Sequence, residues 1–216
     1  MATYLGLVND VLIRLRETEV NSVQDTLYSK LIGKLINDSK RRVENAFDWN
    51  ALGSIITVTT VSGTTNYSIV GSGGRFRTLQ VLNTTNRYEM INAPVNQIDR
   101  DLLISNVTNA QPTYYAFNGV DSNGDTKVDL YPVPNGTYTI KFSLIVPQVD
   151  LSADADIITI PYDAVVQGAY AVAVAERGED NGLVSSEAAL IYRGILADAI
   201  AQESGRFIEN ECWVAT

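Results

Sequence analysis

The chain contains no histidine and a single cysteine, Cys212, among its 216 residues. Histidine is the commonest general base near neutral pH and a frequent metal ligand. Its absence excludes Ser-His-Asp and Cys-His catalysis. A lone cysteine cannot form an internal disulfide, which fits a reducing compartment. We therefore expect a protein that binds and assembles, with no enzymatic turnover, no metal and no cofactor.

Basic residues are also scarce. The chain has 16 Lys and Arg and 25 Asp and Glu, which gives a net charge of -9. Proteins that grip DNA do so with clustered Lys and Arg, so this balance disfavours that class and suits DNA that passes without sticking. Residues 1–10 lack the basic region of a signal peptide, and no run approaches the roughly 18 apolar residues of a membrane span. We expect synthesis in a cytoplasm and no membrane contact.

Apolar residues recur at helical spacing at both ends of the chain. They predict helices over 3–16, over about 22–50 and over 161–177, and a last helix that begins at 185 or 186 and whose apolar stripe runs to Ala199. Ser22 and Asp25 resemble a capping box that starts the second helix. The core of the resulting bundle should include Leu31, Leu35, Val165, Val172 and Ile195, whereas a solvated or partner-facing side should hold Lys30, Lys34, Asn37, Arg41 and Glu44.

The middle of the chain alternates apolar and polar residues with a period of two, as β-strands do. Expected strands lie at 54–59 and 66–69, joined as a hairpin, and at 76–82, 88–91, 114–117, 127–131 and 138–146. The predicted fold is therefore α+β: the N- and C-terminal helices form a helical bundle, and the middle of the chain forms a central antiparallel β-rich subdomain. Its expected parts are 1–52 with 160–206 (helical), 53–159 (β-rich) and 207–216 (tail).

One loop resembles a calcium site. The run from Asp121 to Asp125 matches the start of an EF-hand loop, but Thr126 stands where that loop needs glycine and Pro132 where it needs glutamate. A polar hairpin tip is the better interpretation.

Two charged clusters remain. Lys40, Arg41 and Arg42 form the one basic run, which is either a solvated helix face or a strip that meets an acidic neighbour. The second cluster lies at a helix end and contains Glu176, Arg177, Glu179 and Asp180. Neighbouring residues on a helix point in different directions, so a structural ion pair or an intersubunit contact is favoured over catalysis.

Several packing patterns resemble the adaptor proteins of short-tailed bacteriophages, also called tail tubular protein A-like or head-to-tail connector proteins. They lie in 7–12, 20–23, 36–44, 47–50 and 175–180, and the resemblance extends over nearly the whole chain. It implies a structural virion protein of the neck or tail, made in the host bacterial cytoplasm. Twelve copies would form a ring between the portal and the tail nozzle, and double-stranded DNA would pass through its lumen.

The resemblance also suggests partners for particular residues. Apolar residues of the tail, namely Phe207, Ile208, Trp213 and Val214, are the expected portal contact. The two charged clusters are candidate contacts between copies of the chain. The loop of Asp121, Ser122, Asn123, Gly124 and Asp125 is the candidate nozzle-facing loop.

A second hypothesis belongs to a different class. The middle of the chain is rich in Thr, Tyr and Asn, as in a β-rich carbohydrate- or receptor-binding tail module. That hypothesis explains the sheet but not the helical ends.

Overall fold

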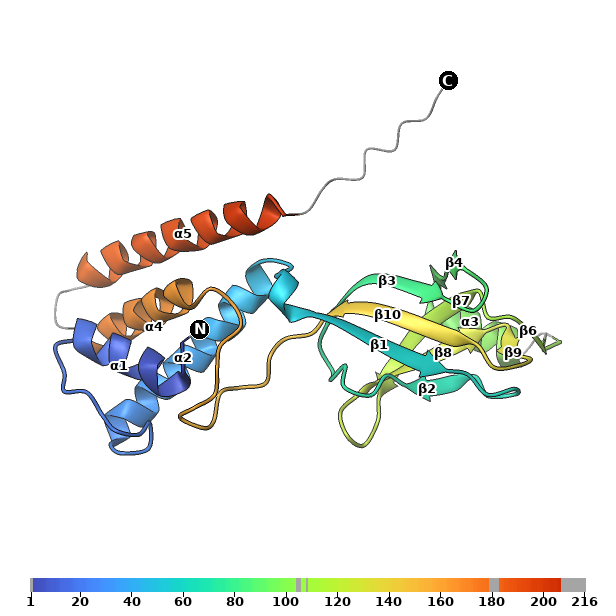
Figure 1. The fold of residues 1–216 in the computed structure, drawn as a ribbon, viewed down its shortest axis with the longest axis horizontal. Coiled ribbons are helices and arrows are strands. Elements are labelled where there is room, and N and C mark those ends of the chain that lie inside the picture. Colours follow the sequence, from blue (N-terminus) through green and yellow to red (C-terminus); the bar gives the residue numbers. More distant parts are fainter. Residues whose placement is uncertain (1, 104–105, 108, 179–182, 207–216) are drawn as a thin grey trace, which may run out of the picture. The chain divides into compact units, whose positions relative to one another are not determined.

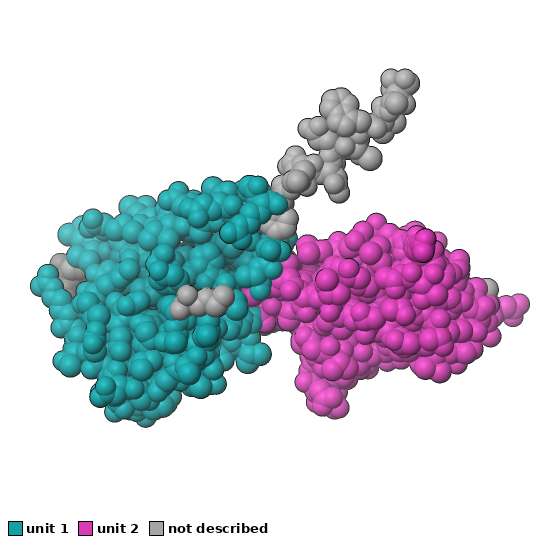
Figure 2. All heavy atoms as spheres, in the orientation of Figure 1, with its two compact units in different colours: residues 1–51, 148–216 teal, residues 52–147 magenta. Residues whose placement is uncertain are grey.

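A computed structural model describes residues 2–103, 106–107, 109–178 and 183–206. The chain divides into two compact units, a helical unit of residues 1–51 and 148–216 and a β unit of residues 52–147 (Figures 1 and 2). The sequence pattern assigned residues 148–159 to the β-rich part, whereas in the structure this stretch groups with the helices. The polar contacts that hold it there are described below.

The helical unit is built from α1 (Tyr4–Arg14), α2 (Leu27–Ala46), α4 (Tyr162–Arg177) and α5 (Leu183–Ser204), and η1 (Asn50–Leu52) follows α2. Helix α4 contacts α1, α2 and α5. It can do so because its buried side chains are small, as at Ala164, Val165 and Ala169. At Gly168, a Cβ atom would lie 2.3 Å from Ser39 Oγ and 3.0 Å from the Tyr192 ring, so only glycine fits. The predicted bundle of front and back helices is confirmed.

The start of α2 differs from the prediction. Thr26 is its N-cap and forms a reciprocal capping box with Ser29. The Asp25 carboxylate instead accepts the backbone N–H groups of Asn21 and Ser22, each at 2.9 Å. The predicted capping box of Ser22 and Asp25 is wrong, because these two residues close a turn that precedes the helix. Helix α4 ends at Gly178, which adopts the left-handed conformation with a φ of 64° that glycine favours at the end of a helix.

The buried face of α2 is also rotated from the predicted one. Leu31, expected in the core, is 38% exposed, whereas Asn37 and Glu44, expected on the solvated side, are buried. Leu35 and Val165 are buried as predicted, and Val172 and Ile195 are half-buried. The reason is that polar residues of α2 face residues 148–151, so helical periodicity of apolar residues alone marks only part of the covered face.

The β unit contains two four-stranded sheets. The first has the order β1 (Gly53–Thr59), β10 (Thr139–Ile145), β3 (Arg77–Asn83) and β4 (Tyr88–Glu89). The second has the order β2 (Asn66–Ser68), β8 (Thr126–Tyr131), β7 (Tyr114–Val120) and β5 (Ile91–Asn92). One core cluster joins the two sheets, with Val58, Val81 and Phe142 from the first and Tyr115, Val128 and Leu130 from the second. The remaining elements are α3 (Val95–Leu103) and the small pair β6 (Asn109–Ala110) and β9 (Val133–Pro134).

Strand pairing is mostly antiparallel, as predicted, with parallel pairs at β5–β7 and β6–β9. The predicted hairpin of β7 and β8 is confirmed. The predicted hairpin of β1 and β2 is wrong, because β1 pairs with β10 and β2 pairs with β8 in the other sheet. Alternation identifies each strand and its buried face, but it does not select the partner. The α+β class itself is confirmed.

Candidate assembly surfaces

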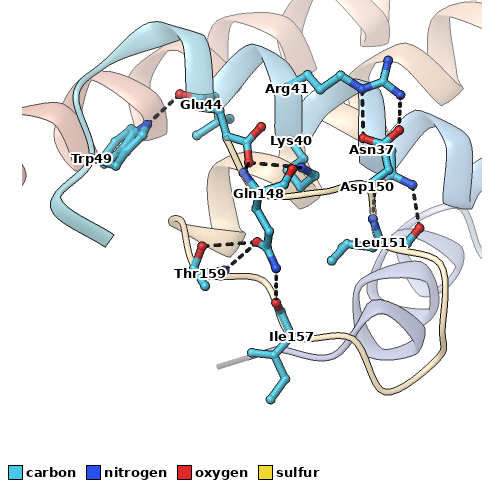
Figure 3. A network of polar contacts seen from close by, with 11 residues as sticks. Asn37, Lys40, Arg41, Glu44, Trp49, Gln148, Asp150, Leu151, Ile157 and Thr159 are labelled. Atoms are coloured by element: carbon cyan, nitrogen blue, oxygen red, sulfur yellow. Dashed lines mark hydrogen bonds and ion pairs between the residues drawn. The ribbon is translucent and has the colours of Figure 1, made fainter. Parts of the chain in front are cut away.

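Four polar side chains of α2 bind residues 148–151, the start of the second chain segment of the helical unit (Figure 3). We call this set, Asn37, Lys40, Arg41 and Glu44, the polar row. Lys40 Nζ donates a hydrogen bond to the carbonyl oxygen of Gln148 at 2.6 Å and pairs with Glu44 Oε1 at 3.1 Å. The same Glu44 oxygen accepts the backbone N–H of Gln148 at 3.1 Å. Two side chains, one helical turn apart, therefore bind both backbone polar groups of one residue.

The row continues toward the start of α2. Asn37 accepts the N–H of Leu151 at 2.9 Å and donates to its carbonyl oxygen at 3.0 Å. Arg41 makes a two-pronged contact with the Asp150 carboxylate at 3.2 and 2.9 Å. The Gln148 side chain, in turn, donates to the carbonyl oxygen of Ile157 at 2.7 Å. Hydrogen bonds and an ion pair thus fix residues 148–151 to α2, and the bond from Gln148 to Ile157 closes the following segment on itself.

The ion pair at the centre of this row is buried, with the Lys40 side chain fully covered and that of Glu44 nearly so. Burial raises the pKa of the Glu44 carboxyl above its ordinary value, although the charge of Lys40 opposes that rise. A buried pair of this kind stabilises a fold only while both partners and their hydrogen bonds are present. Lys40 and Glu44 are therefore structural residues of the subunit.

This burial divides the basic run predicted as an intersubunit contact. Lys40 is inside the subunit, whereas Arg41 and Arg42 are exposed. Since Lys40 has no exposed surface, it cannot contact another copy. Arg42 remains exposed, and the exposed Arg41 is already paired with Asp150 of its own subunit. Lys40 differs from the two arginines in having a Glu four residues after it, at the spacing of a helical ion pair, but that spacing does not indicate burial.

The second charged cluster is similarly divided. Arg177 forms an ion pair with Glu17, donates to the Tyr28 hydroxyl at 3.0 Å and lies over the Tyr28 ring at 5.2 Å from its centroid. These contacts join the end of α4 to the segment after α1 and the first turn of α2, as the ion-pair interpretation expects of Arg177. Glu176 is exposed. Glu179 and Asp180 lie outside the described residues.

The loop of Asp121 to Asp125 forms the tip of the β7–β8 hairpin. Asp121 Oδ1 accepts the N–H groups of Asn123 and Asp125 at 2.8 and 3.0 Å, and the Ser68 hydroxyl and these backbone groups lower the pKa of Asp121. Asp125 Oδ1 accepts the N–H groups of Gly71 and Gly73, each at 3.0 Å. Both carboxylates thus accept hydrogen bonds from backbone N–H groups and hold the loops in place. In the part of the chain that the structure describes, no group of His, Cys, Asp and Glu residues is arranged to bind a metal ion.

Helix α5 carries apolar residues on both of its sides. Its Ala188 is buried, and Tyr192, Ile195 and Ala199 are half-buried. Leu183 is 77% exposed, Leu190 is 65% exposed, and Val184 and Ile191 are also exposed. Four large apolar side chains on one helix in water are unusual and are typical of a surface that another protein covers. We call the set Leu183, Val184, Leu190 and Ile191 the α5 apolar face.

Sequence reasoning missed this face, because it considered only the buried side of this helix, represented by Ile195, and left Leu183 and Leu190 unassigned. The signal was present in the seven-residue spacing from Leu183 to Leu190, which marks a second stripe along the helix.

Comparison with known families agrees with an assembly role. A family model described as SU10 adaptor protein matches residues 2–208. The chain belongs to this family. It is a phage adaptor protein, and its role is structural. No curated protein matched the chain in a sequence search.

The family model spans both units of the adaptor, so the exposed surfaces of the helical unit and the β-hairpin tip all belong to the adaptor region. No helix within the described ranges has the length and hydropathy that crossing a membrane requires. The expected portal-contact residues, Phe207, Ile208, Trp213 and Val214, lie outside the described residues.

Proposed function

We propose that this adaptor protein is a head-to-tail adaptor of the tail tubular protein A-like kind. Twelve copies form a ring between the portal and the tail nozzle, and double-stranded DNA passes through the lumen without specific binding. The helical unit makes the ring, and the β unit faces the tail with its Asp121 to Asp125 loop. The acidic balance of the chain disfavours retention of DNA in such a conduit.

The α5 apolar face is the observation that carries this proposal. In a ring, one surface of each copy contacts a different surface of the next copy. Helix α4 lies between α2 and α5 and contacts both (Figure 1). The α2 side has its own exposed apolar residues, Leu27 and Leu31. The α5 apolar face of one copy and the start of α2 in the next therefore supply two complementary surfaces.

Charged residues supplement this contact at its edge. Arg42 and Glu176 are exposed on the helical unit and are suited to pairing with neighbours of opposite charge, whereas Arg41 is paired with Asp150 inside the subunit. Exposed pairs add specificity more than affinity. The apolar residues should therefore dominate the energy of ring formation.

The alternative, a carbohydrate-binding tail module, is less well supported. It would use the β unit and leave the helices without a role, whereas the family model includes the helices at both ends. It also offers no account of the α5 apolar face.

The test is the double substitution of Leu190 and Ile191 by glutamate in the full-length protein. Both side chains are exposed, so the thermal unfolding of the subunit should change little. Ring assembly on purified portal, measured by mass photometry, should be lost. Val149→Glu is the matched control, because Val149 is 85% exposed on the same unit and lies outside the α5 apolar face. Normal ring assembly by the double variant would refute the proposal.

A further inference from the structure

Strand β1 is an edge strand with none of the usual protections. It is the terminal strand of its sheet, and within the part of the chain that the structure describes it pairs with β10 alone. Its seven residues, Gly-Ser-Ile-Ile-Thr-Val-Thr, include no charge and no proline. The other sheet edges, β2, β4 and β5, are two or three residues long. Native proteins blunt long edges with charges, prolines or bulges, because an open edge pairs with another strand.

The register of β1 with β10 shows which backbone groups are open. Val146 N–H donates to Leu52 O at 2.9 Å, and Thr60 N–H donates to Tyr138 O at 2.8 Å. Hydrogen-bonded pairs alternate along an antiparallel ladder, so the even-numbered residues between Leu52 and Thr60 also bond to β10. The N–H and C=O groups of Gly53, Ile55, Thr57 and Thr59 therefore point away from the sheet. Among the described residues, these groups have no hydrogen-bond partner.

We propose that the open edge of β1 pairs with β1 of a second copy, antiparallel and about a twofold axis at Ile56. In this register Gly53 lies opposite Thr59, and Ile55 lies opposite Thr57. Each of the four residues with open groups thus meets another residue with open groups. The edge is therefore self-complementary over its whole length. A register shifted by one residue would place residues with open groups opposite residues that already bond to β10.

Side chains fit the same arrangement. Ile55, which is 65% exposed, meets Thr57 of the second copy on the outer face, and pairs of β-branched residues are favourable across strands. On the inner face, the half-buried Ile56 meets its own counterpart at the axis. Because β1 has no charged residue, bringing two copies together causes no like-charge repulsion along the seam.

This twofold contact is different from the ring contact. It uses the β unit and the same surface on both copies, whereas a ring uses the helical unit and two different surfaces. It would hold free subunits as dimers before assembly. The inference stands on the geometry of β1 and does not depend on the proposed function.

The experiment is sedimentation of the full-length protein carrying Leu190→Glu and Ile191→Glu, which removes the α5 contact and leaves the β1 contact. A monomer–dimer equilibrium is expected. Adding Thr57→Pro, or separately Ile55→Lys, should raise the dimer dissociation constant by at least about tenfold. The Thr57 N–H is an open group, so proline there removes no bond to β10. Leu79→Lys on β3, also an exposed site on this sheet, is the control and should leave the equilibrium unchanged.

Amide hydrogen exchange gives a second measurement that does not depend on a substitution. The amides of Ile55 and Thr57 should exchange more slowly as the protein concentration rises, whereas those of Ile56 and Val58 should be protected at every concentration. A monomer at all concentrations would overturn the proposal. So would a dimer that persists with both Thr57→Pro and Ile55→Lys, which would show that the chain self-associates through another surface.

Discussion

Lys40 and Glu44, four residues apart on α2, bind opposite polar groups of the same residue, Gln148. Lys40 donates to its carbonyl oxygen, and Glu44 accepts its N–H. The first residue of the second part of the helical unit is thereby held at both of its backbone groups by one buried ion pair. The arrangement explains why Lys40, and Glu44 of the predicted solvated or partner-facing side, are both covered.

The first prediction concerns this pair. Lys40→Met should lower the free energy of unfolding by about 3 to 5 kcal/mol, because Glu44 is left buried without its counter-charge. The double variant with Glu44→Gln should recover a large part of that loss, since a glutamine at position 44 still accepts the Gln148 N–H and carries no charge. Urea denaturation of the single and double variants measures the coupling, and strict additivity would show that the two residues act independently.

The second prediction concerns pH. The Asp156 carboxylate accepts the N–H groups of Ser152 and Ala153 at 2.7 and 2.8 Å, and these bonds hold the pKa of Asp156 below its ordinary value. A lowered carboxyl pKa contributes stability above the unfolded-state pKa, and this contribution is lost as the pH falls through the folded-state pKa.

Asp156→Asn should therefore lower the urea midpoint at neutral pH and have a progressively smaller effect in acid. Midpoints measured across the acidic range provide the test. A difference between wild type and variant that stays constant down to the lowest pH would contradict it.

The third prediction compares two glycines inside helices. Gly168→Ala should destabilise the subunit by about 1 to 3 kcal/mol, because the new Cβ meets Ser39 and Tyr192. Gly194 lies on α5 with no atom within 4 Å of the position its Cβ would take. Gly194→Ala should stabilise the subunit by up to about 1 kcal/mol, since alanine is the better helix former. Thermal unfolding of both variants decides the point, and equal effects would mean that α4 does not approach its neighbours closely.

The comparison of sequence with structure separates local from long-range information. Helix ends marked by a single strong signal were predicted, as at Gly178. Strands with clear alternation were also predicted, but the partners of β1 and β2 were not, because alternation specifies a face and not a neighbour. The two-residue strands β6 and β9 are too short to produce a pattern.

The candidate surfaces follow the same rule. The hairpin tip at Asp121 could be predicted because its turn chemistry is local. Burial of Lys40 and Asn37 could not, because their partners lie more than a hundred residues further along the chain, at Gln148 and Leu151. The α5 apolar face was missed because a helix that is apolar on both sides gives no single stripe, so periodicity does not indicate which side its neighbour covers.

The fourth prediction concerns the tail. Phe207, Ile208, Trp213 and Val214 are apolar, and aromatic anchors such as Trp213 are common energetic centres of protein contacts. Deleting 207–216 should abolish attachment to portal-bearing heads and leave the unfolding of the subunit unchanged. A pull-down with purified heads measures attachment, and Trp213→Ala separates the anchor from the rest of the tail. Undiminished attachment of the deleted protein would rule out the tail as the portal contact.

The central claim is that copies of this adaptor form a ring on the portal. Cryo-electron microscopy of the purified protein bound to its portal tests that claim most directly, since the map shows both the number of copies and the surfaces in contact. The account predicts twelve copies, each with the α5 apolar face covered by the helical unit of the next copy. A portal-bound protein whose α5 faces solvent, with copies that do not touch one another through their helical units, would contradict it.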